Sequence, residues 1–211
     1  MHKSFPESVR NSTDLAELNR FVHEVVGKSC WKATFTYPDE LVLHIGEKIP
    51  YSHPRLASQF KGEWLFGTCG SEWVLSTLTA AAELRMALKT IGTTAIGGGP
   101  LTRLEMEPVR ETLASADYED SAELKEKVAV LDESVVEAFV VAQKAVTVAL
   151  RNDSQWWLLS VEHHAANDPE TGGVADWELF MPQHLYIEFR PGGVWSCLRS
   201  DEPIEGEAEL R

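Results

Sequence analysis

Tryptophan recurs in this chain inside one short pattern, in which a large apolar residue follows two positions later. Four of the seven tryptophans head such a unit: Trp64-Leu65-Phe66, Trp73-Val74-Leu75, Trp157-Leu158-Leu159 and Trp177-Glu178-Leu179. In a β-strand, residues i and i+2 point to the same face. Each unit therefore predicts a strand that buries an indole beside a second apolar side chain, and an aromatic side chain buries about 150–250 Å².

The four units fall into two pairs, one within residues 62–75 and one within residues 155–180. This arrangement predicts an internal duplication. Neighbouring residues such as Glu63, Glu72 and Glu178 give each strand a polar outer face. That pattern favours buried indoles over the alternative, an exposed aromatic platform that binds a sugar or a base.

Other segments alternate apolar and polar residues as strands do. Residues 135–150 suit either a helix or two strands, and their Val and Thr content favours two strands that bend at Gln143. Residues 31–37 and 41–45 are predicted to form a hairpin. Two further strands are predicted at 62–67 and 71–75, with Cys69 in a hairpin turn between them. The remaining predicted strands are at 101–110, at 155–162 and in a three-stranded meander over 176–198.

Two helices are predicted. The first follows N-cap candidates at residues 11–14, ends at Gly27, and carries an apolar stripe of Leu15, Leu18, Phe21, Val22 and Val25. The second covers residues 77–91, which are rich in Ala and Leu. The sequence thus predicts one α+β domain over residues 1–211. Its main element is an antiparallel sheet with a Trp-rich buried face, and the N-terminal helix and the mid-chain helix pack on that sheet.

The charge of the chain is strongly acidic, with a formal net charge of -14 and a pI of about 4.9. Acidic residues concentrate at 114–134, predicted to be a solvated insertion with a short helix, and at 200–211, predicted to be a flexible tail. Nucleic acid requires a basic surface, so we expect no nucleic-acid binding. An acidic surface suits a basic protein partner.

The compartment is predicted to be the cytoplasm. No stretch approaches about 18 uninterrupted apolar residues, so no membrane span is expected. The start of the chain, Met1 to Glu7, lacks the apolar core of a signal peptide. The cysteines Cys30, Cys69 and Cys197 are odd in number and form no CxxC pair, which predicts free thiols and no zinc site.

Few residues suggest catalysis. His163 and His164, followed by Asp168, form the one local cluster from which a metal or hydrolytic site could be drawn, with His44 or His184 from afar. Adjacent residues on a strand point to opposite faces, so the two histidines converge only if the strand ends there. Cys69 is the candidate nucleophile. Residues 92–99 lack the Lys-Ser/Thr of a phosphate-binding loop, and we expect no cofactor and no metal.

Several motifs together resemble an uncharacterised bacterial family. Three segments resemble the front half of that family: Leu41-Val42-Leu43-His44-Ile45-Gly46, Gly62-Glu63-Trp64-Leu65 and Trp73-Val74-Leu75. Two later segments resemble its ending: Asp176-Trp177-Glu178-Leu179-Phe180-Met181-Pro182 and Gly193-Val194-Trp195. Cys69 lies four residues before Trp73, where the family has two. The family has no assigned activity, so the resemblance implies a fold and transfers no catalytic residue.

Two functions of different classes follow from these observations. The first is a non-catalytic protein-binding module, immunity-like or inhibitor-like, that engages a basic partner through its acidic surface. The alternative is a metal-dependent or cysteine-based hydrolase that uses the His163, His164 and Asp168 cluster. The absence of a catalytic motif favours the first, so we expect the protein not to be an enzyme. The sequence does not indicate whether the chain forms oligomers.

Overall fold

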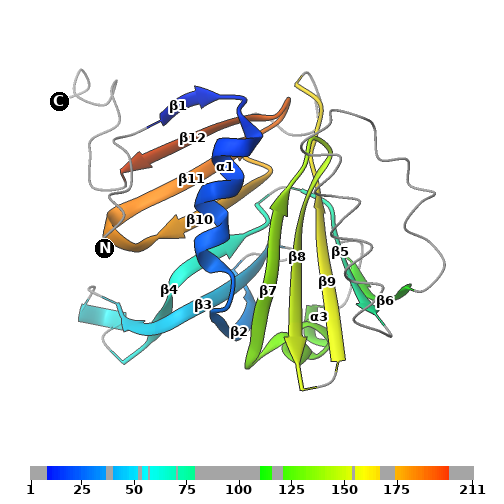
Figure 1. The fold of residues 1–211 in the computed structure, drawn as a ribbon. Helices are drawn as coiled ribbons and strands as arrows, with labels where there is room; N and C mark the ends of the chain where they lie inside the picture. The colour runs from blue at the N-terminus through cyan, green and yellow to red at the C-terminus, as the bar shows by residue number, and fades with distance from the viewer. Residues whose placement is uncertain are drawn as a thin grey trace.

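A single antiparallel sheet dominates the fold (Figure 1). The computed structural model describes residues 9–36, 40–51, 54–56, 58–69, 71–78, 110–115, 121–153, 155–166 and 174–199. Within them, twelve strands lie in the order β1-β12-β11-β10-β4-β3-β2-β7-β8-β9-β5-β6. Their bounds are β1 Val9–Ser12, β2 Ser29–Phe35, β3 Leu41–Pro50, β4 Phe60–Gly67, β5 Trp73–Leu78, β6 Arg110–Ser115, β7 Ser134–Val141, β8 Ala145–Asn152, β9 Gln155–Glu162, β10 Trp177–Met181, β11 Leu185–Arg190 and β12 Val194–Arg199.

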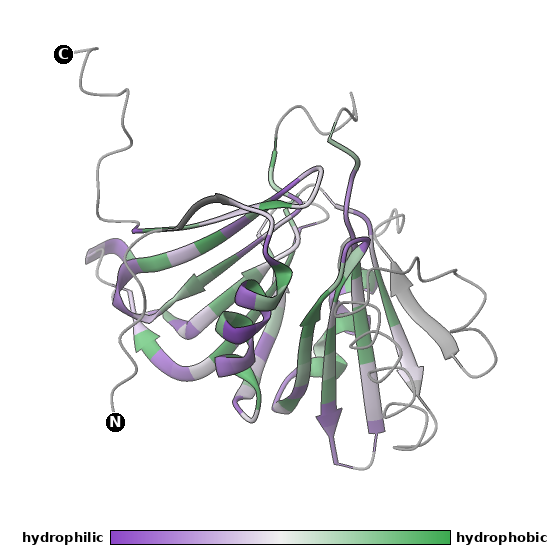
Figure 2. Cartoon of the chain, turned by 45° about the horizontal axis from the view of Figure 1, so that its top comes forward, coloured by the Kyte–Doolittle hydropathy of each residue, from purple (hydrophilic) through white to green (hydrophobic). Residues whose placement is uncertain are grey.

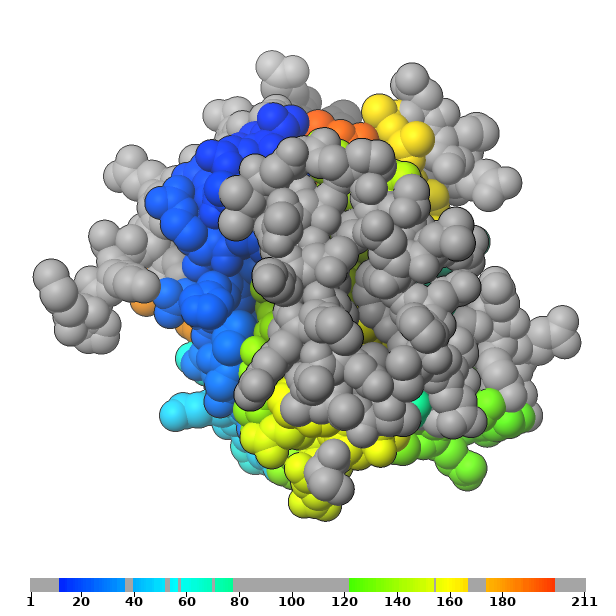
Figure 3. Space-filling view, turned by 45° about the vertical axis from the view of Figure 1, so that its right-hand side comes forward, coloured from blue at the N-terminus to red at the C-terminus, as the bar shows by residue number. Residues whose placement is uncertain are grey.

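Two short α-helices lie among the described residues. They are α1, Leu15–Val22, and α3, Ser121–Val128, and a 3-10 turn extends each of them, His23–Val25 after α1 and Ala129–Leu131 after α3. Asp14 caps α1, because its side chain accepts hydrogen bonds from the backbone N–H groups of Ala16 and Glu17. The helix α1 packs beside β7 (Figure 3). Neither helix is long and apolar enough to cross a membrane.

The chain repeats one order of elements. In each half a helix, a 3-10 turn and a residue with positive φ, Gly27 or Glu133, lead into three consecutive antiparallel strands, β2-β3-β4 or β7-β8-β9. The two halves meet where β2 pairs with β7. The next strand of each half crosses to the other: β5 pairs with β9, and β10 pairs with β4. This exchange places a strand that follows each half beside the last strand of the other half.

The exchange corrects one prediction. Residues 62–67 and 71–75 are not the two arms of a hairpin around Cys69, because β4 pairs with β3 and β10 whereas β5 pairs with β9 and β6. The structure confirms the other predicted elements that it describes. These are the N-terminal helix, the hairpin of β2 and β3, the two strands β7 and β8 within 135–150, the strand at 155–162, and the meander of β10, β11 and β12. The α+β label is confirmed in part, since the fold is largely sheet.

The buried face holds the predicted tryptophans. Trp64, Trp73 and Trp177 are buried with their i+2 neighbours, whereas Trp157 is half-buried. The aromatic rings of Phe66, Phe139, Trp177 and Phe189 contact one another between the two halves. The tryptophans themselves are not duplicated between the halves. β4 and β9 are equivalent strands, but the fifth residue is Trp64 in β4 and Leu159 in β9.

The acidic segment 114–134 contributes to the core. Leu124, Val128 and Leu131 are buried in the main hydrophobic cluster, so α3 and the turn after it are a packed element of the second half. Hydrophobic residues also run along β7 and β8 at the centre of the sheet (Figure 2). Thr77 and Leu78 belong to β5, and the rest of the predicted helix at 77–91, most of the predicted strand at 101–110 and the tail 200–211 lie outside the described residues.

Candidate functional site

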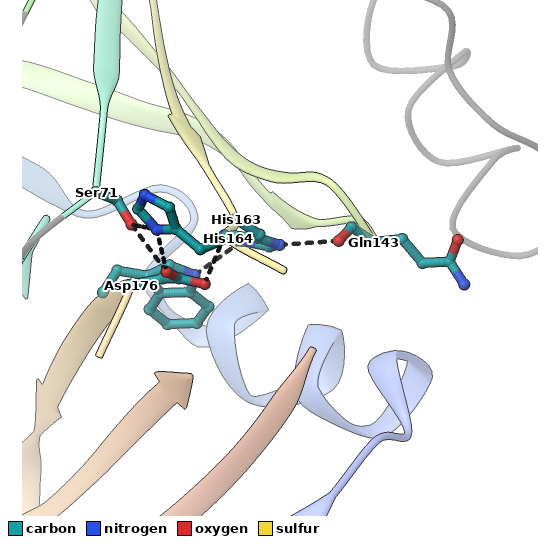
Figure 4. Close-up of polar contacts among 6 residues, drawn as sticks. Ser71, Gln143, His163, His164 and Asp176 are labelled. Atoms are coloured by element: carbon teal, nitrogen blue, oxygen red, sulfur yellow. Dashed lines mark hydrogen bonds and ion pairs between the residues drawn. The ribbon is translucent and has the colours of Figure 1, made fainter. Parts of the chain in front are cut away.

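The two predicted histidines lie just past β9, which ends at Glu162. The ring of His163 packs against Phe189 of the aromatic core, with centroids 4.1 Å apart and the rings inclined by 32°. Trp177 Nε1 donates to His163 Nε2 at 3.0 Å, so the ring proton sits on Nδ1. His163 Nδ1 lies 3.2 Å from the carbonyl oxygen of Gln143 (Figure 4). Burial lowers the pKa of His163 to about 4. His163 is therefore a neutral, half-buried histidine at pH 7.

His164 turns the other way and meets Asp176 and Ser71 (Figure 4). Its Nδ1 lies 2.7 Å from Asp176 Oδ1, and its backbone N–H donates to Asp176 Oδ2 at 3.2 Å. The Ser71 hydroxyl donates to Asp176 Oδ1 at 3.1 Å. Asp176 is buried, so burial raises its pKa, and the hydrogen bonds from His164 and Ser71 oppose the rise.

The geometry of this cluster differs from a Ser-His-Asp catalytic arrangement. In that arrangement the acid holds one imidazole nitrogen and the serine uses the other. Here Ser71 lies 3.4 Å from His164 Nδ1, the same nitrogen that faces Asp176. His164 therefore cannot take the Ser71 proton while it is bound to the acid. The cluster instead ties the β4–β5 connection to the β9–β10 connection, the two crossings that join the halves.

The other predicted site residues do not join this cluster. Asp168 lies outside the described residues. His44 is buried on β3, where its Nδ1 accepts from the Gly62 N–H, and burial with nearby Lys32 lowers its pKa to about 4. Burial and then nearby carboxylates, Glu178 first, raise the pKa of the Cys69 thiol, which disfavours the nucleophilic thiolate. No group of His, Cys, Asp and Glu among the described residues has the geometry of a metal site.

A second candidate lies on the opposite face of the sheet, which we call the outer face. Trp177, Phe189 and Trp195 are buried in the core, and Phe21 of α1 packs against Trp195. Side chains alternate along a strand, so the residues between them point away from α1. They form two rows across β4, β10, β11 and β12: Gly67, Glu178, Glu188 and Ser196 in one, and Leu65, Phe180, Tyr186 and Leu198 in the other.

The first row carries carboxylates side by side. Glu178 pairs directly with Glu188 across β10 and β11. Glu40 completes the row, because its Oε1 lies only 3.2 Å from the point where a Cβ on Gly67 would be. Burial raises the pKa of Glu178, and the charges of Glu188 and Glu40 raise it further. Neither Glu178 nor Glu188 forms an ion pair with a cation in the part of the chain that the structure describes.

The second row is aromatic at its centre. Phe180 is 41% exposed, a large fraction for a phenylalanine in a strand. Its ring stacks on Tyr186 with centroids 5.7 Å apart. Leu65 and Leu198 flank the two rings and are half-buried. The outer face therefore presents an apolar belt beside a row of carboxylates.

Sequence reasoning placed Glu178 on a polar outer face but missed this site. The chain positions of Glu40, Glu178 and Glu188 show no local motif, and only the pairing of β4, β10 and β11 brings them together. Comparison of the chain with protein-family models, curated proteins and solved structures finds no match.

Proposed function

We propose that the protein is a non-catalytic binding module that engages a basic partner protein through its outer face. The observation that carries the proposal is the pair Glu178 and Glu188, directly opposite each other and in no ion pair among the described residues. Arg190, on the same face, donates to Ser196 Oγ at 3.2 Å. Like charges at directly opposed positions destabilise a sheet. Functional sites often contain groups that lower the stability of the unbound protein, because a bound ligand removes the unfavourable interaction.

The apolar belt supports the same proposal. An exposed ring such as Phe180 loses unfavourable contact with water when a partner covers it, and aromatic residues are enriched in protein interfaces. The carboxylate row sets the sign of that partner. With a net charge of -14, long-range attraction also favours a basic protein, and like-charged macromolecules are repelled.

The hydrolase alternative has weaker support. His163 is neutral and fully engaged between Trp177 and Gln143. His164 shares one nitrogen between its serine and its acid neighbour. Both arrangements serve packing, so the geometry favours binding over hydrolysis.

The test is site-specific photo-crosslinking in the cell of origin. A photoreactive amino acid replaces Phe180 in one variant and, as a matched control, replaces Asp153, an exposed residue in the β8–β9 turn. We expect a crosslink to a basic protein from position 180 and none from position 153, and we expect Glu178→Gln with Glu188→Gln to abolish it. Equal crosslinks from both positions, or crosslinks that persist without the two charges, contradict the proposal.

A further inference from the structure

The carboxylates of the outer face form a straight row. Glu178 and Glu188 are direct cross-strand partners, and Gly67 is the partner of Glu178 on the other side. The Glu40 carboxylate stands over Gly67 and is held there by the Thr36 hydroxyl, which donates to Glu40 Oε2 at 2.6 Å. Adjacent strands lie about 4.8 Å apart, so neighbouring carboxylates are close enough to share one cation.

The stacked rings lie one row away on the same face. Phe180 and Tyr186 are direct partners across β10 and β11, and each is two residues along its strand from a glutamate of the carboxylate row. Two residues of a strand span about 7 Å. The rings of Phe180 and Tyr186 stack on each other, inclined by only 22°, beside Glu178 and Glu188.

This combination suits a planar cation better than a spherical one. A guanidinium group donates hydrogen bonds from two edges and places its flat face on an aromatic ring at the same time. An ammonium group is compact and strongly hydrated, so it gains less from the rings. The chemistry thus distinguishes arginine from lysine at equal charge.

We infer that the outer face binds an arginine side chain of the partner, with the guanidinium between Glu178 and Glu188 and its face against the ring of Tyr186. This inference rests on the proposed function and makes it more specific. The segment around that arginine covers Phe180 and so removes the exposed ring from water.

The experiment compares two peptides of equal charge, tetra-arginine amide and tetralysine amide, by calorimetry at low ionic strength. We expect the arginine peptide to bind about three- to fivefold more tightly, the difference that one exposed cation–π contact supplies. Tyr186→Ala with Phe180→Ala should reduce that ratio to about one. Glu178→Gln with Glu188→Gln should abolish binding of both peptides. Glu162→Gln, which removes an exposed charge from β9, should leave both affinities unchanged.

The outcomes separate the inference from the proposed function. If both peptides bind with equal affinity and neither binds the variant without the Glu178 and Glu188 charges, the arginine assignment is overturned. The proposal of a basic partner then still stands. A ratio that survives removal of both rings also overturns it. Binding that is insensitive to the Glu178 and Glu188 substitutions, or absent for both peptides, overturns the site, and crosslinking from position 180 then tests the proposed function on its own.

Discussion

Protonation of His163 is expected to destabilise the fold at mildly acid pH. The folded-state pKa of His163 is about 4, below the ordinary value of 6.5 that applies to the unfolded chain. The unfolded chain therefore takes up the proton first. The stability contributed by neutral His163 is complete above pH 6.5 and is lost as the pH falls toward 4. The cause is structural, because the ring lies between Phe189 and Trp177 and its Nε2 already accepts a hydrogen bond.

The size of the effect follows from the two pKa values. At about pH 5 the unfolded chain is largely protonated at this position and the folded chain is not. The difference spans about 1.5 pH units, which corresponds to about 2 kcal/mol of unfolding free energy. This figure is an upper limit, since the ring is only half-buried by surface area.

A matched variant isolates this histidine from the other titrating groups. The pKa values of Asp176 and Glu178 are raised, so their protonation opposes the loss, and His44 adds a loss of the same sign as His163. His163→Gln keeps an acceptor for Trp177 and removes only one titration. Urea unfolding followed by tryptophan fluorescence gives the stability of both proteins at each pH. We expect the advantage of the wild type over the variant to shrink by up to about 2 kcal/mol between pH 7 and pH 5.

Two results refute this account. One is a difference between wild type and His163→Gln that stays constant between pH 7 and pH 5. The other is an NMR titration in which the ring of His163 takes up its proton near pH 6.5. The NMR readout does not depend on the variant, so it holds if the substitution itself impairs folding.

Three further substitutions are tested by the same urea unfolding experiment. Glu178→Gln should raise stability at pH 7 by about 0.5–1 kcal/mol, because it removes a like charge opposite Glu188; a loss of stability would contradict the electrostatic argument. Asp176→Ala should cost about 2–3 kcal/mol, since it leaves the buried Ser71 hydroxyl and the half-buried donors of His164 without their acceptor; a neutral result would contradict this account. Gly62→Ala should cost more than about 2 kcal/mol, because its Cβ would lie 2.5 Å from the backbone nitrogen of Ile45. Gly27→Ala is the control, because a Cβ at Gly27 would have no neighbour within 4 Å. Its only cost is the positive φ, so we expect a loss of stability of about 1 kcal/mol. An equal loss of stability at Gly62 and Gly27 would refute the steric argument.

Local patterns in the sequence were sufficient for most individual elements. The N-cap at Asp14 and the helix stop near Gly27, where φ is +85°, follow from side-chain and backbone chemistry within a few residues. The Val-rich run 135–150 resolved into β7 and β8, because β-branched residues suit a pleated surface. The three-stranded meander also needs only short turns.

Pairing over long separations was beyond local patterns. Cys69 and its neighbours have the composition of a hairpin turn, yet the chain continues from β4 to β5 on the far side of the sheet. The gain from crossing is not local: β5 packs Trp73 and Leu75 into the core of the other half. The same holds for the polar cluster, in which Ser71 and Asp176 meet only because both crossings pass the same point.

The two halves share a framework but differ on the outer face, and this difference supports a docking role. In the second half, Ala138, Ala149 and Leu158 point to the outer side and are buried. In the first half, the outer side of β10 and β11 leaves Phe180 exposed. The outer face therefore buries apolar side chains over β7, β8 and β9 and leaves Phe180 exposed on β10.

Under the proposed function, the charges beside the apolar belt would set the direction of a bound segment. Lys32 pairs with His44 at the start of the row that continues through Leu65 to Phe180, and Lys48 stands over the ring of Trp31 beside His44. Lys32 and Lys48 thus lie at the β2–β3 side of the apolar belt, and Glu178 and Glu188 lie at the β10–β11 side. Arg190 of β11 donates to Ser196 at the end of the carboxylate row. Under the proposed function, a basic segment would be repelled by Lys32 and Lys48 and would place its cationic residues over Glu178 and Glu188.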